Sequence, residues 1–172
     1  MAERVALDPE GVAREVCLRQ LAVRARSRAE LARALARREI PEDVVERLLS
    51  RFGEVGLIDD RAFAEEFVAS RHGTQGLARQ ALSAQLRRRG IDNDTAEAAL
   101  EVVDADAEEA AARALIGRRL RATAGLDAMV RARKLVGVLA RKGYPPELAY
   151  RVVWEELRAE GAELEDDPPV DL

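Results

Sequence analysis

The fold of this chain is decided by the stretch GLARQALSAQLRRRGIDNDTAEAAL, residues Gly76 to Leu100. Leu82 and Leu86 are four residues apart and therefore share one face of a helix. Gly90 suits the left-handed position that ends such a helix, because a Cβ there would clash with the backbone. Asp92 can accept the free N–H groups that open a second helix. The stretch predicts a helix, a tight turn and another helix.

The same unit occurs twice more in the chain. Upstream it covers Ser27 to Leu49, and downstream it covers Arg131 to Val153. The three turns fall at positions 39, 90 and 143, so they are 51 and 53 residues apart. A nearly constant spacing of this length is typical of a helical repeat array. Glu39 stands where the other two turns have glycine, and a left-handed conformation there would cost about 1 kcal/mol. We therefore expect the first turn either to carry this cost or to be built differently.

The composition agrees with a helical fold. Charged residues make up 35% of the chain and aromatic residues only 3%, so the core must consist of Leu, Val and Ala. We predict an all-α protein of about nine helices, arranged as tandem three-helix repeats that stack into a short, elongated solenoid. The predicted segments are residues 10–55 for repeat 1, 59–103 for repeat 2, 104–157 for repeat 3 and 158–172 for an acidic, disordered tail.

The net charge of −4 hides an asymmetry along the chain. From Glu155 onward there are eight acidic residues and one basic residue, so the preceding body is mildly basic. The single cysteine, Cys17, excludes an internal disulfide framework and suits a reducing compartment, where we expect it to be a small buried apolar residue. Because no apolar run approaches the length of a membrane span and no signal-peptide core is present, we expect a soluble, cytoplasmic protein.

Paired aspartates at Asp59 and Asp60 could indicate a metal or acid–base site. We instead interpret Asp59 as the N-cap of a helix that ends near Arg71, with Asp60 facing the positive end of the helix dipole. His72 is the only histidine, so neither a Ser–His triad nor a histidine metal site can be assembled. Phosphate-binding glycine loops and Cys/His clusters are also missing from the sequence. We expect a non-enzymatic protein without cofactor or metal.

Positive charge recurs near the end of the second helix of each repeat, with one further cluster in the third repeat. The residues are Arg37, Arg38, Arg87, Arg88, Arg89, Arg118, Arg119, Arg121, Arg141 and Lys142. Any one cluster could simply offset a helix dipole. Three clusters at one repeat phase favour a solvated basic stripe that meets a phosphate backbone or an acidic protein groove. If these arginines only cap helices, the next candidate face surrounds Arg118, Arg119, Arg121, Arg131 and Arg133.

Three motifs resemble the RecX family, the bacterial regulators of the RecA recombinase. They are Ser27-Arg28-x-Glu30-Leu31-x3-Leu35, then Gly56-Leu57-Ile58-Asp59-Asp60-x2-Phe63-Ala64 with Phe67-Val68-x2-Arg71, and Leu82-x3-Leu86-x3-Gly90-Ile91. The resemblance spans roughly residues 12–157. It implies a non-catalytic modulator that binds RecA filaments on single-stranded DNA and suppresses filament growth, ATP hydrolysis, strand exchange and the SOS response. The partners it implies are the RecA filament and single-stranded DNA, with duplex DNA as a further non-specific partner.

Two other classes of protein remain open from the residues alone. Tandem three-helix units also describe helix-turn-helix and Myb-like DNA-binding regulators. Against that class, the third helices are short, acidic and poor in side chains that read bases. The other class is a purely structural scaffold, for which we expect no effect in a recombinase assay. Since the sequence has no long heptad seam, we expect a monomer in either case.

Overall fold

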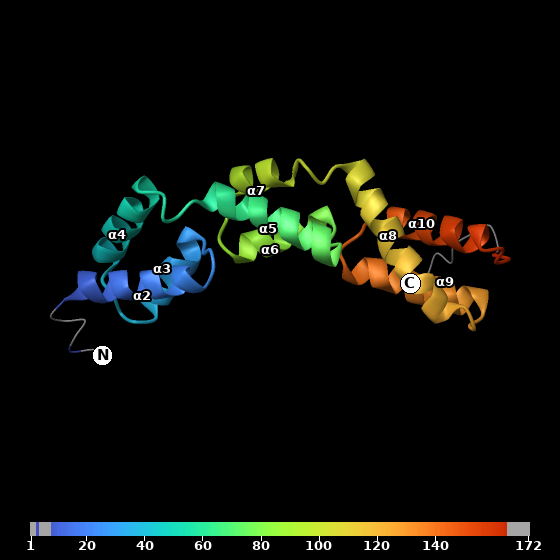
Figure 1. Ribbon diagram of the computed structural model, residues 1–172, viewed down its shortest axis with the longest axis horizontal. Coiled ribbons are helices and arrows are strands. Elements are labelled where there is room, and N and C mark those ends of the chain that lie inside the picture. The colour runs from blue at the N-terminus through green and yellow to red at the C-terminus, as the bar shows by residue number, and fades with distance from the viewer. Residues whose placement is uncertain (1–2, 4–7, 165–172) are drawn as a thin grey trace. The chain divides into compact units, whose positions relative to one another are not determined.

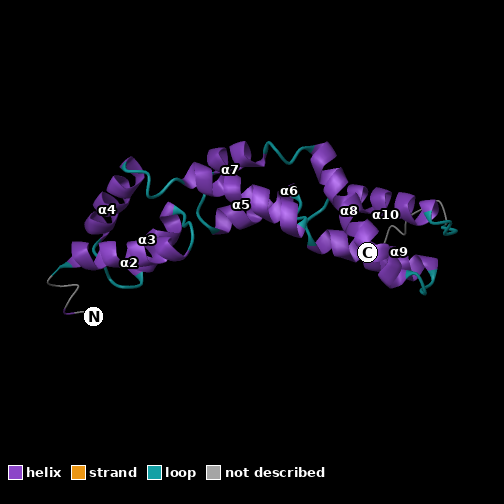
Figure 2. Ribbon diagram, in the orientation of Figure 1, coloured by secondary structure: helices purple, strands orange, loops and turns teal. Residues whose placement is uncertain are grey.

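The computed structural model describes residue 3 and residues 8–164 of the chain. These residues form nine helices and no strand, which confirms the prediction of an all-α fold (Figures 1 and 2). The helices are α2 (Pro9–Val23), α3 (Arg28–Ala36), α4 (Glu42–Glu54), α5 (Asp60–Gln75), α6 (Arg79–Arg88), α7 (Asn93–Leu100), α8 (Ala105–Thr123), α9 (Ala128–Arg141) and α10 (Pro146–Ala159).

The starts of α3, α5 and α7 are fixed by side chains close in sequence, as predicted. Ser27 and Glu30 form a reciprocal capping box at the start of α3. The Asp59 carboxylate accepts the Ala62 N–H at 3.0 Å, so Asp59 caps α5. Asp92 accepts the Thr95 N–H at 2.9 Å and so opens α7 in the same way. These carboxylates are therefore structural caps.

The length of α5 differs from the prediction. We expected this helix to end near Arg71, but it continues to Gln75. His72 therefore lies inside its last turn, and its Nδ1 is 2.9 Å from the carbonyl oxygen of Leu77. The left-handed Gly76, with φ 61°, then ends the helix. Gly73 is therefore part of α5 as well.

The chain divides into two compact units, which are described separately. Unit 1 consists of residues 1–67 and 85–99, and unit 2 of residues 68–84 and 100–172. The helices α5 and α6 contribute residues to both units. In unit 1, α2, α3 and α4 enclose a core that includes Val12, Leu35 and Phe52. In unit 2, α8, α9 and α10 pack around Leu139 and Trp154.

Unit 1 contains a joint between the first and second three-helix groups. The buried Ser27 hydroxyl donates to the carbonyl of Arg89, 62 residues away, at 2.6 Å. The Arg28 N–H, at the start of α3, donates to the Asp60 carboxylate at 2.8 Å. Because the first N–H groups of a helix have no intrahelical partner, these bonds attach the start of α3 to the next group. Asp60 therefore does more than face the dipole of its own helix.

Unit 2 contains the equivalent joint one repeat later. The Ala78 N–H donates to the carbonyl of Lys142 at 3.0 Å, and the Arg79 N–H donates to the Glu108 carboxylate at 2.9 Å. Ala78 and Arg79 hold the positions that Ser27 and Arg28 hold in the first repeat. Each joint thus uses a carbonyl just before the turn and a carboxylate in the first turn of the following group. The repetition is one of tertiary contacts as well as of sequence.

The turn glycines are required by these joints. Gly90 has φ 79°, and a Cβ added to it would lie 2.2 Å from the Cβ of Ala29. Gly143 has φ 88°, and a Cβ there would lie 2.6 Å from the Cβ of Ala81. Glu39 adopts the same left-handed conformation, with φ 59°, and is exposed. The first turn is therefore built like the others and carries the steric cost.

The third group differs where a further repeat would have to attach. Its helix α9 begins at Ala128, capped by Asp127, rather than close to Arg131. Arg131 is only 7% exposed, and its guanidinium donates to the Thr123 hydroxyl, the Leu120 carbonyl and the Glu160 carboxylate. The residue equivalent to Ser27 and Ala78 is thus used inside its own three-helix group. The joint is not repeated at α9.

The elongated stacking of the repeats stays a prediction. A compact 172-residue globule would have a radius of gyration of about 16 Å. Since each joint connects only neighbouring groups, we expect small-angle X-ray scattering to give a clearly larger radius and a skewed distance distribution. A radius near 16 Å with a symmetric distribution would reject the extended array.

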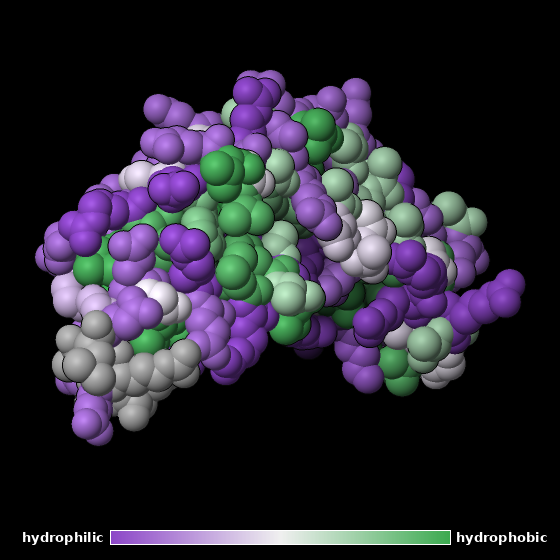
Figure 3. All heavy atoms as spheres, turned by 60° about the vertical axis from the view of Figure 1, so that its left-hand side comes forward, coloured by the Kyte–Doolittle hydropathy of each residue, from purple (hydrophilic) through white to green (hydrophobic). Residues whose placement is uncertain are grey.

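The surface is polar with scattered apolar side chains. Figure 3 shows apolar side chains gathered in the middle of one face, surrounded by hydrophilic ones. Among the described residues, the large hydrophobic side chains that are exposed are those of Leu18, Val23, Val55, Leu57, Val102, Leu126 and Val130. Within residues 8–164, no helix is both long and apolar enough to cross a membrane.

Candidate nucleic-acid interface

Five of the ten predicted basic residues lie in unit 1. Arg37, Arg87 and Arg88 are exposed, as a binding surface requires. Arg38 is half-buried and donates to the Ala34 carbonyl at 3.2 Å, so it also closes its own helix. We therefore still propose that these four residues bind an anionic partner. Arg38 can do so only in part, because its guanidinium also bonds its own helix.

Arg89 does not fit the prediction of a solvated stripe. Its guanidinium contacts the Glu30 carboxylate at 2.8 Å and lies 4.9 Å from the ring centroid of Phe67. Burial of Glu30 disfavours its charged form, but hydrogen bonds from Arg24 and the Ser27 N–H, with the charges of Arg24 and Arg89, hold its pKa below the ordinary value. Arg89 therefore stabilises the joint in unit 1. The expectation that all three arginines at 87–89 are solvated was wrong for this one.

The other five predicted residues lie in unit 2. Arg118, Arg119, Arg121 and Arg141 are exposed. Lys142 is half-buried, and its carbonyl accepts the Ala78 N–H of the joint. The fallback set also contained Arg131, which is buried under Glu160 and Thr123 and cannot line a binding face. The structure thus separates surface cations from structural ones.

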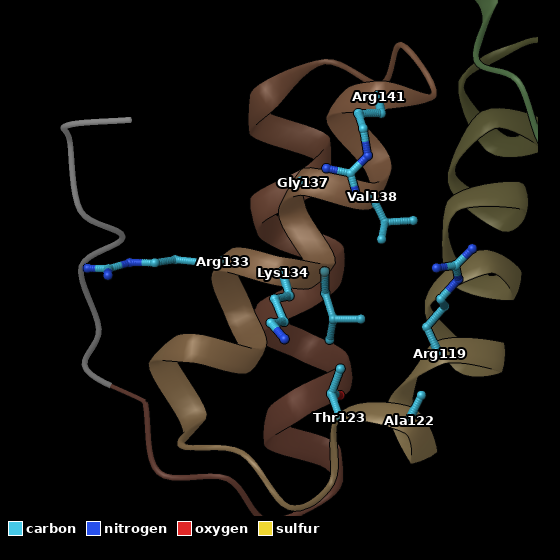
Figure 4. A pocket seen from close by; sticks show the side chains of 9 residues that line it. Arg119, Ala122, Thr123, Arg133, Lys134, Gly137, Val138 and Arg141 are labelled. Atoms are coloured by element: carbon cyan, nitrogen blue, oxygen red, sulfur yellow. The ribbon is translucent and has the colours of Figure 1, made fainter.

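Two of the predicted residues meet in one groove between α8 and α9. The groove has a volume of about 370 Å³, and its basic side chains are those of Arg119, Arg133, Lys134 and Arg141. Arg119 comes from α8, while Lys134 and Arg141 come from α9 and lie two helical turns apart on it (Figure 4). Arg133 also lines the groove, although its side chain points away from these three in the same view. We call Arg119, Lys134 and Arg141 the groove cations.

The groove is shaped by residues without charge. Leu135 and Val138 form apolar lining between the groove cations, and Ala122 and Thr123 line the α8 side. Gly137 has no side chain, and the Arg141 guanidinium lies over it. A Cβ added to Gly137 would lie 3.2 Å from Nη1 of Arg141. The Arg141 guanidinium therefore folds back along α9 towards the groove (Figure 4).

Buried hydrogen bonds of Thr123 and Arg131 hold the α8 side of the groove in place. The Thr123 hydroxyl donates to the Leu120 carbonyl at 3.0 Å and accepts from Nε of Arg131 at 3.2 Å. Arg131 also contacts the Glu160 carboxylate at 2.6 Å. These bonds join α8, α9 and the end of α10. The buried Arg131 therefore holds in place the two helices, α8 and α9, that carry the groove cations. It acts on the groove by positioning.

The groove is suited to anions with several oxygen atoms. Among the described residues that line it there is no carboxylate. Guanidinium groups stay protonated at physiological pH and bind phosphate or carboxylate oxygens through paired N–H donors. A lysine ammonium adds a compact charge. A concave surface lined by one sign of charge also raises the local concentration of oppositely charged ligands.

Other chemistry finds little support in the described part of the chain. No group of three or more His, Cys, Asp or Glu residues there is placed to hold a metal ion. Cys17 is fully buried, and burial raises the pKa of its thiol to about 11. The thiol is therefore protonated at neutral pH and is a poor nucleophile.

Lys134 is the groove residue that sequence reasoning missed. We searched for cations at helix C-termini, whereas Lys134 lies in the middle of α9. A usable signal was present, because Lys134, Val138 and Arg141 have the i, i+4, i+7 spacing of one helical face. The pairing of that face with Arg119 on α8 needs the packed structure.

Comparison with known families accounts for all three helix groups. Family models match residues 13–52 as the first RecX three-helix domain, residues 59–100 as the second and residues 106–153 as the third. The chain belongs to the RecX family. The resemblance suggested by the sequence motifs is therefore confirmed.

Relatives of the RecX family match nearly the whole chain. "Regulatory protein RecX" of Thermobifida fusca is 55% identical over 91% of this chain and 85% of its own length. The protein of the same name from Streptomyces coelicolor is 50% identical over 92% of this chain and 84% of its own. The crystal structure of RecX from Lactobacillus salivarius has the same fold, with a TM-score of 0.75 and 21% identity over 87% of this chain and 97% of that one. The family is thus one of regulatory proteins.

Proposed function

We propose that this RecX-family chain inhibits RecA filaments on single-stranded DNA and thereby damps recombination, DNA repair and the SOS response. Membership of a family of regulatory proteins supports the class of activity. The observation that carries the proposal is the groove between α8 and α9, which presents Arg119, Lys134 and Arg141 with no carboxylate among the described residues that line it. Such a groove fits the phosphate backbone of the DNA or an acidic surface of the filament.

The contact in this proposal is electrostatic and independent of base sequence. Aromatic residues make up only 3% of the chain, and the groove is lined by none. Stacking on bases, the usual means of gripping single strands, therefore contributes little here. Phosphate contacts fix position without reading sequence, so single-stranded DNA and, more weakly, duplex DNA are the nucleic-acid partners. The chain acts as a monomer that needs no cofactor and performs no chemical step.

The exposed cations of unit 1 offer a second proposed contact, separate from the groove in unit 2. Arg37, Arg87 and Arg88 have solvated side chains and stand close to the turns that end α3 and α6. In the third group, Arg118 and Arg121 add to the charge near the groove cations along α8. Contacts from more than one helix group would let one chain bridge successive subunits of a filament, which is a direct way to alter filament growth.

Fluorescence anisotropy of the labelled chain tests the proposed partner. Four ligands would be titrated at two salt concentrations: RecA filaments on single-stranded DNA, the bare strand, a random duplex, and a duplex selected for binding. We expect the filament to bind most tightly and the affinity to fall as salt rises, since bound phosphates release counterions. Tight binding to one selected duplex, with no preference for the filament, would reject the proposal and favour a helix-turn-helix regulator.

A further inference from the structure

The chain leaves its last helix by folding back onto unit 2. After α10 ends at Ala159, Gly161 takes a left-handed conformation with φ 87°. The Ala162 N–H then donates to the Leu157 carbonyl at 3.0 Å. Ala162 and Leu164 are partly buried and pack against the hydrophobic cluster of α8, α9 and α10. This cluster includes Leu135, which also lines the groove.

The residues that follow carry the charge opposite to that of the groove. Residues 165–172 contain Glu165, Asp166, Asp167 and Asp171 and no lysine, arginine or histidine. An extended chain advances about 3.3–3.6 Å per residue, so these eight residues can reach roughly 26–29 Å beyond Leu164. Leu164 packs against the hydrophobic cluster that contains the groove residue Leu135, so the segment starts from the helix group that forms the groove.

We propose that the acidic segment 165–172 binds in the groove between α8 and α9 and competes there with DNA phosphate. The inference rests on the proposed function, because that function makes DNA phosphate the competing ligand. Occupancy of the groove by the segment can be measured without DNA or RecA. The segment supplies carboxylate oxygens, which guanidinium groups bind with the same paired geometry as phosphate. The groove would then be masked by its own chain when no nucleic acid is present.

Tethering makes this contact effective although each ion pair is weak. Exposed ion pairs contribute little individually and are screened by salt. A segment held a few residues away has an effective concentration in the millimolar range, because its docking is intramolecular. A polyanion with many phosphates can still displace it. The segment therefore sets a threshold for nucleic-acid binding without blocking it.

The first experiment measures occupancy in the full-length chain with a spin label at Val170→Cys. Cys17 is buried with a thiol pKa of about 11, so labelling at neutral pH is confined to the new cysteine. We expect the label to broaden the amide signals of residues 119, 134 and 141 in low salt. The broadening should disappear in 0.5 M salt and in a matched neutral variant, Glu165→Gln, Asp166→Asn, Asp167→Asn and Asp171→Asn.

Two results of this experiment would overturn the inference. One is the absence of broadening at the groove, which would show that the segment does not bind there. Equal broadening in the neutral variant counts as the same result, because the contact would then not depend on the acidic charges. The other is broadening that occurs only between molecules, when a spin-labelled chain without isotope is mixed with an isotope-labelled chain without spin label. That result would assign the groove to the segment of a second copy.

The second experiment measures competition. We expect the neutral variant to bind a single-stranded oligonucleotide at least threefold more tightly than the native chain in low salt. The gain should vanish when Lys134→Glu and Arg141→Glu are added, because the groove is then closed to both ligands. A gain that persists in that background would reflect overall charge and would overturn the inference. Inhibition of RecA by the native chain is measured separately, so the proposed function can fail or stand independently of this result.

Discussion

Lys134→Glu combined with Arg141→Glu is expected to weaken binding to RecA filaments on single-stranded DNA by tenfold or more. Both side chains are exposed, lie two turns apart on α9 and line a groove to which residues 8–164 contribute no carboxylate. Reversing them replaces two attractions to phosphate or carboxylate oxygens by two repulsions. Stability should hardly change, because neither side chain is buried. Filament affinity at two salt concentrations and the melting temperature together test this expectation.

A matched control comes from the neighbouring residue on the same helix. Arg133 and Lys134 are consecutive and exposed, but the side chain of Arg133 points away from the groove cations (Figure 4). Arg133→Glu and Lys134→Glu make the same change in net charge, so overall charge cannot distinguish them. We expect Lys134→Glu to weaken filament binding several-fold more and to give a shallower salt dependence than Arg133→Glu. Equal losses would show that the groove cations contribute no more than another exposed cation of α9.

Gly90→Ala is expected to lower the free energy of unfolding by on the order of 2–5 kcal/mol. A side chain at φ 79° is strained by about 1–2 kcal/mol. Its Cβ would also lie 2.2 Å from the Cβ of Ala29, so the joint in unit 1 must open or shift, which typically costs a further 1–3 kcal/mol. Urea unfolding followed by circular dichroism would measure the loss.

Two companion variants separate the strain from the clash. Glu39→Gly removes a side chain from the equivalent left-handed position and should stabilise the protein by about 1 kcal/mol, because Glu39 is exposed. Ala29→Gly in the Gly90→Ala background should recover part of the loss, since it removes the atom that the new Cβ meets. A Gly90→Ala protein as stable as the native one would contradict the assignment of this turn to a close joint.

Local features of the fold could be predicted from the sequence because their partners are three or four residues apart. The capping box at Ser27 and Glu30 and the N-caps at Asp59 and Asp92 are of this kind. The left-handed turns at Gly90 and Gly143 follow from the same reasoning. The hydrophobic spacing of each helix then gave the all-α repeat architecture.

Features that depend on distant partners could not be predicted in this way. The Ser27 hydroxyl bonds the carbonyl of Arg89, 62 residues away, and Arg89 itself pairs with Glu30 in the same joint. The sequence shows three consecutive arginines at 87–89 but not which of them the joint uses. Likewise, the groove forms only where α9 packs beside α8 and brings Arg119 opposite Lys134. In each case tertiary packing selects among residues that are alike in sequence.

We propose that this chain inhibits RecA on single-stranded DNA through the groove between α8 and α9. The most direct test is the rate of ATP hydrolysis by RecA on single-stranded DNA, measured while the native chain or the Lys134→Glu, Arg141→Glu variant is titrated in. We predict that the native chain lowers the rate in a dose-dependent manner and that the variant needs at least tenfold more protein for the same effect. A rate that the native chain leaves unchanged would contradict the account.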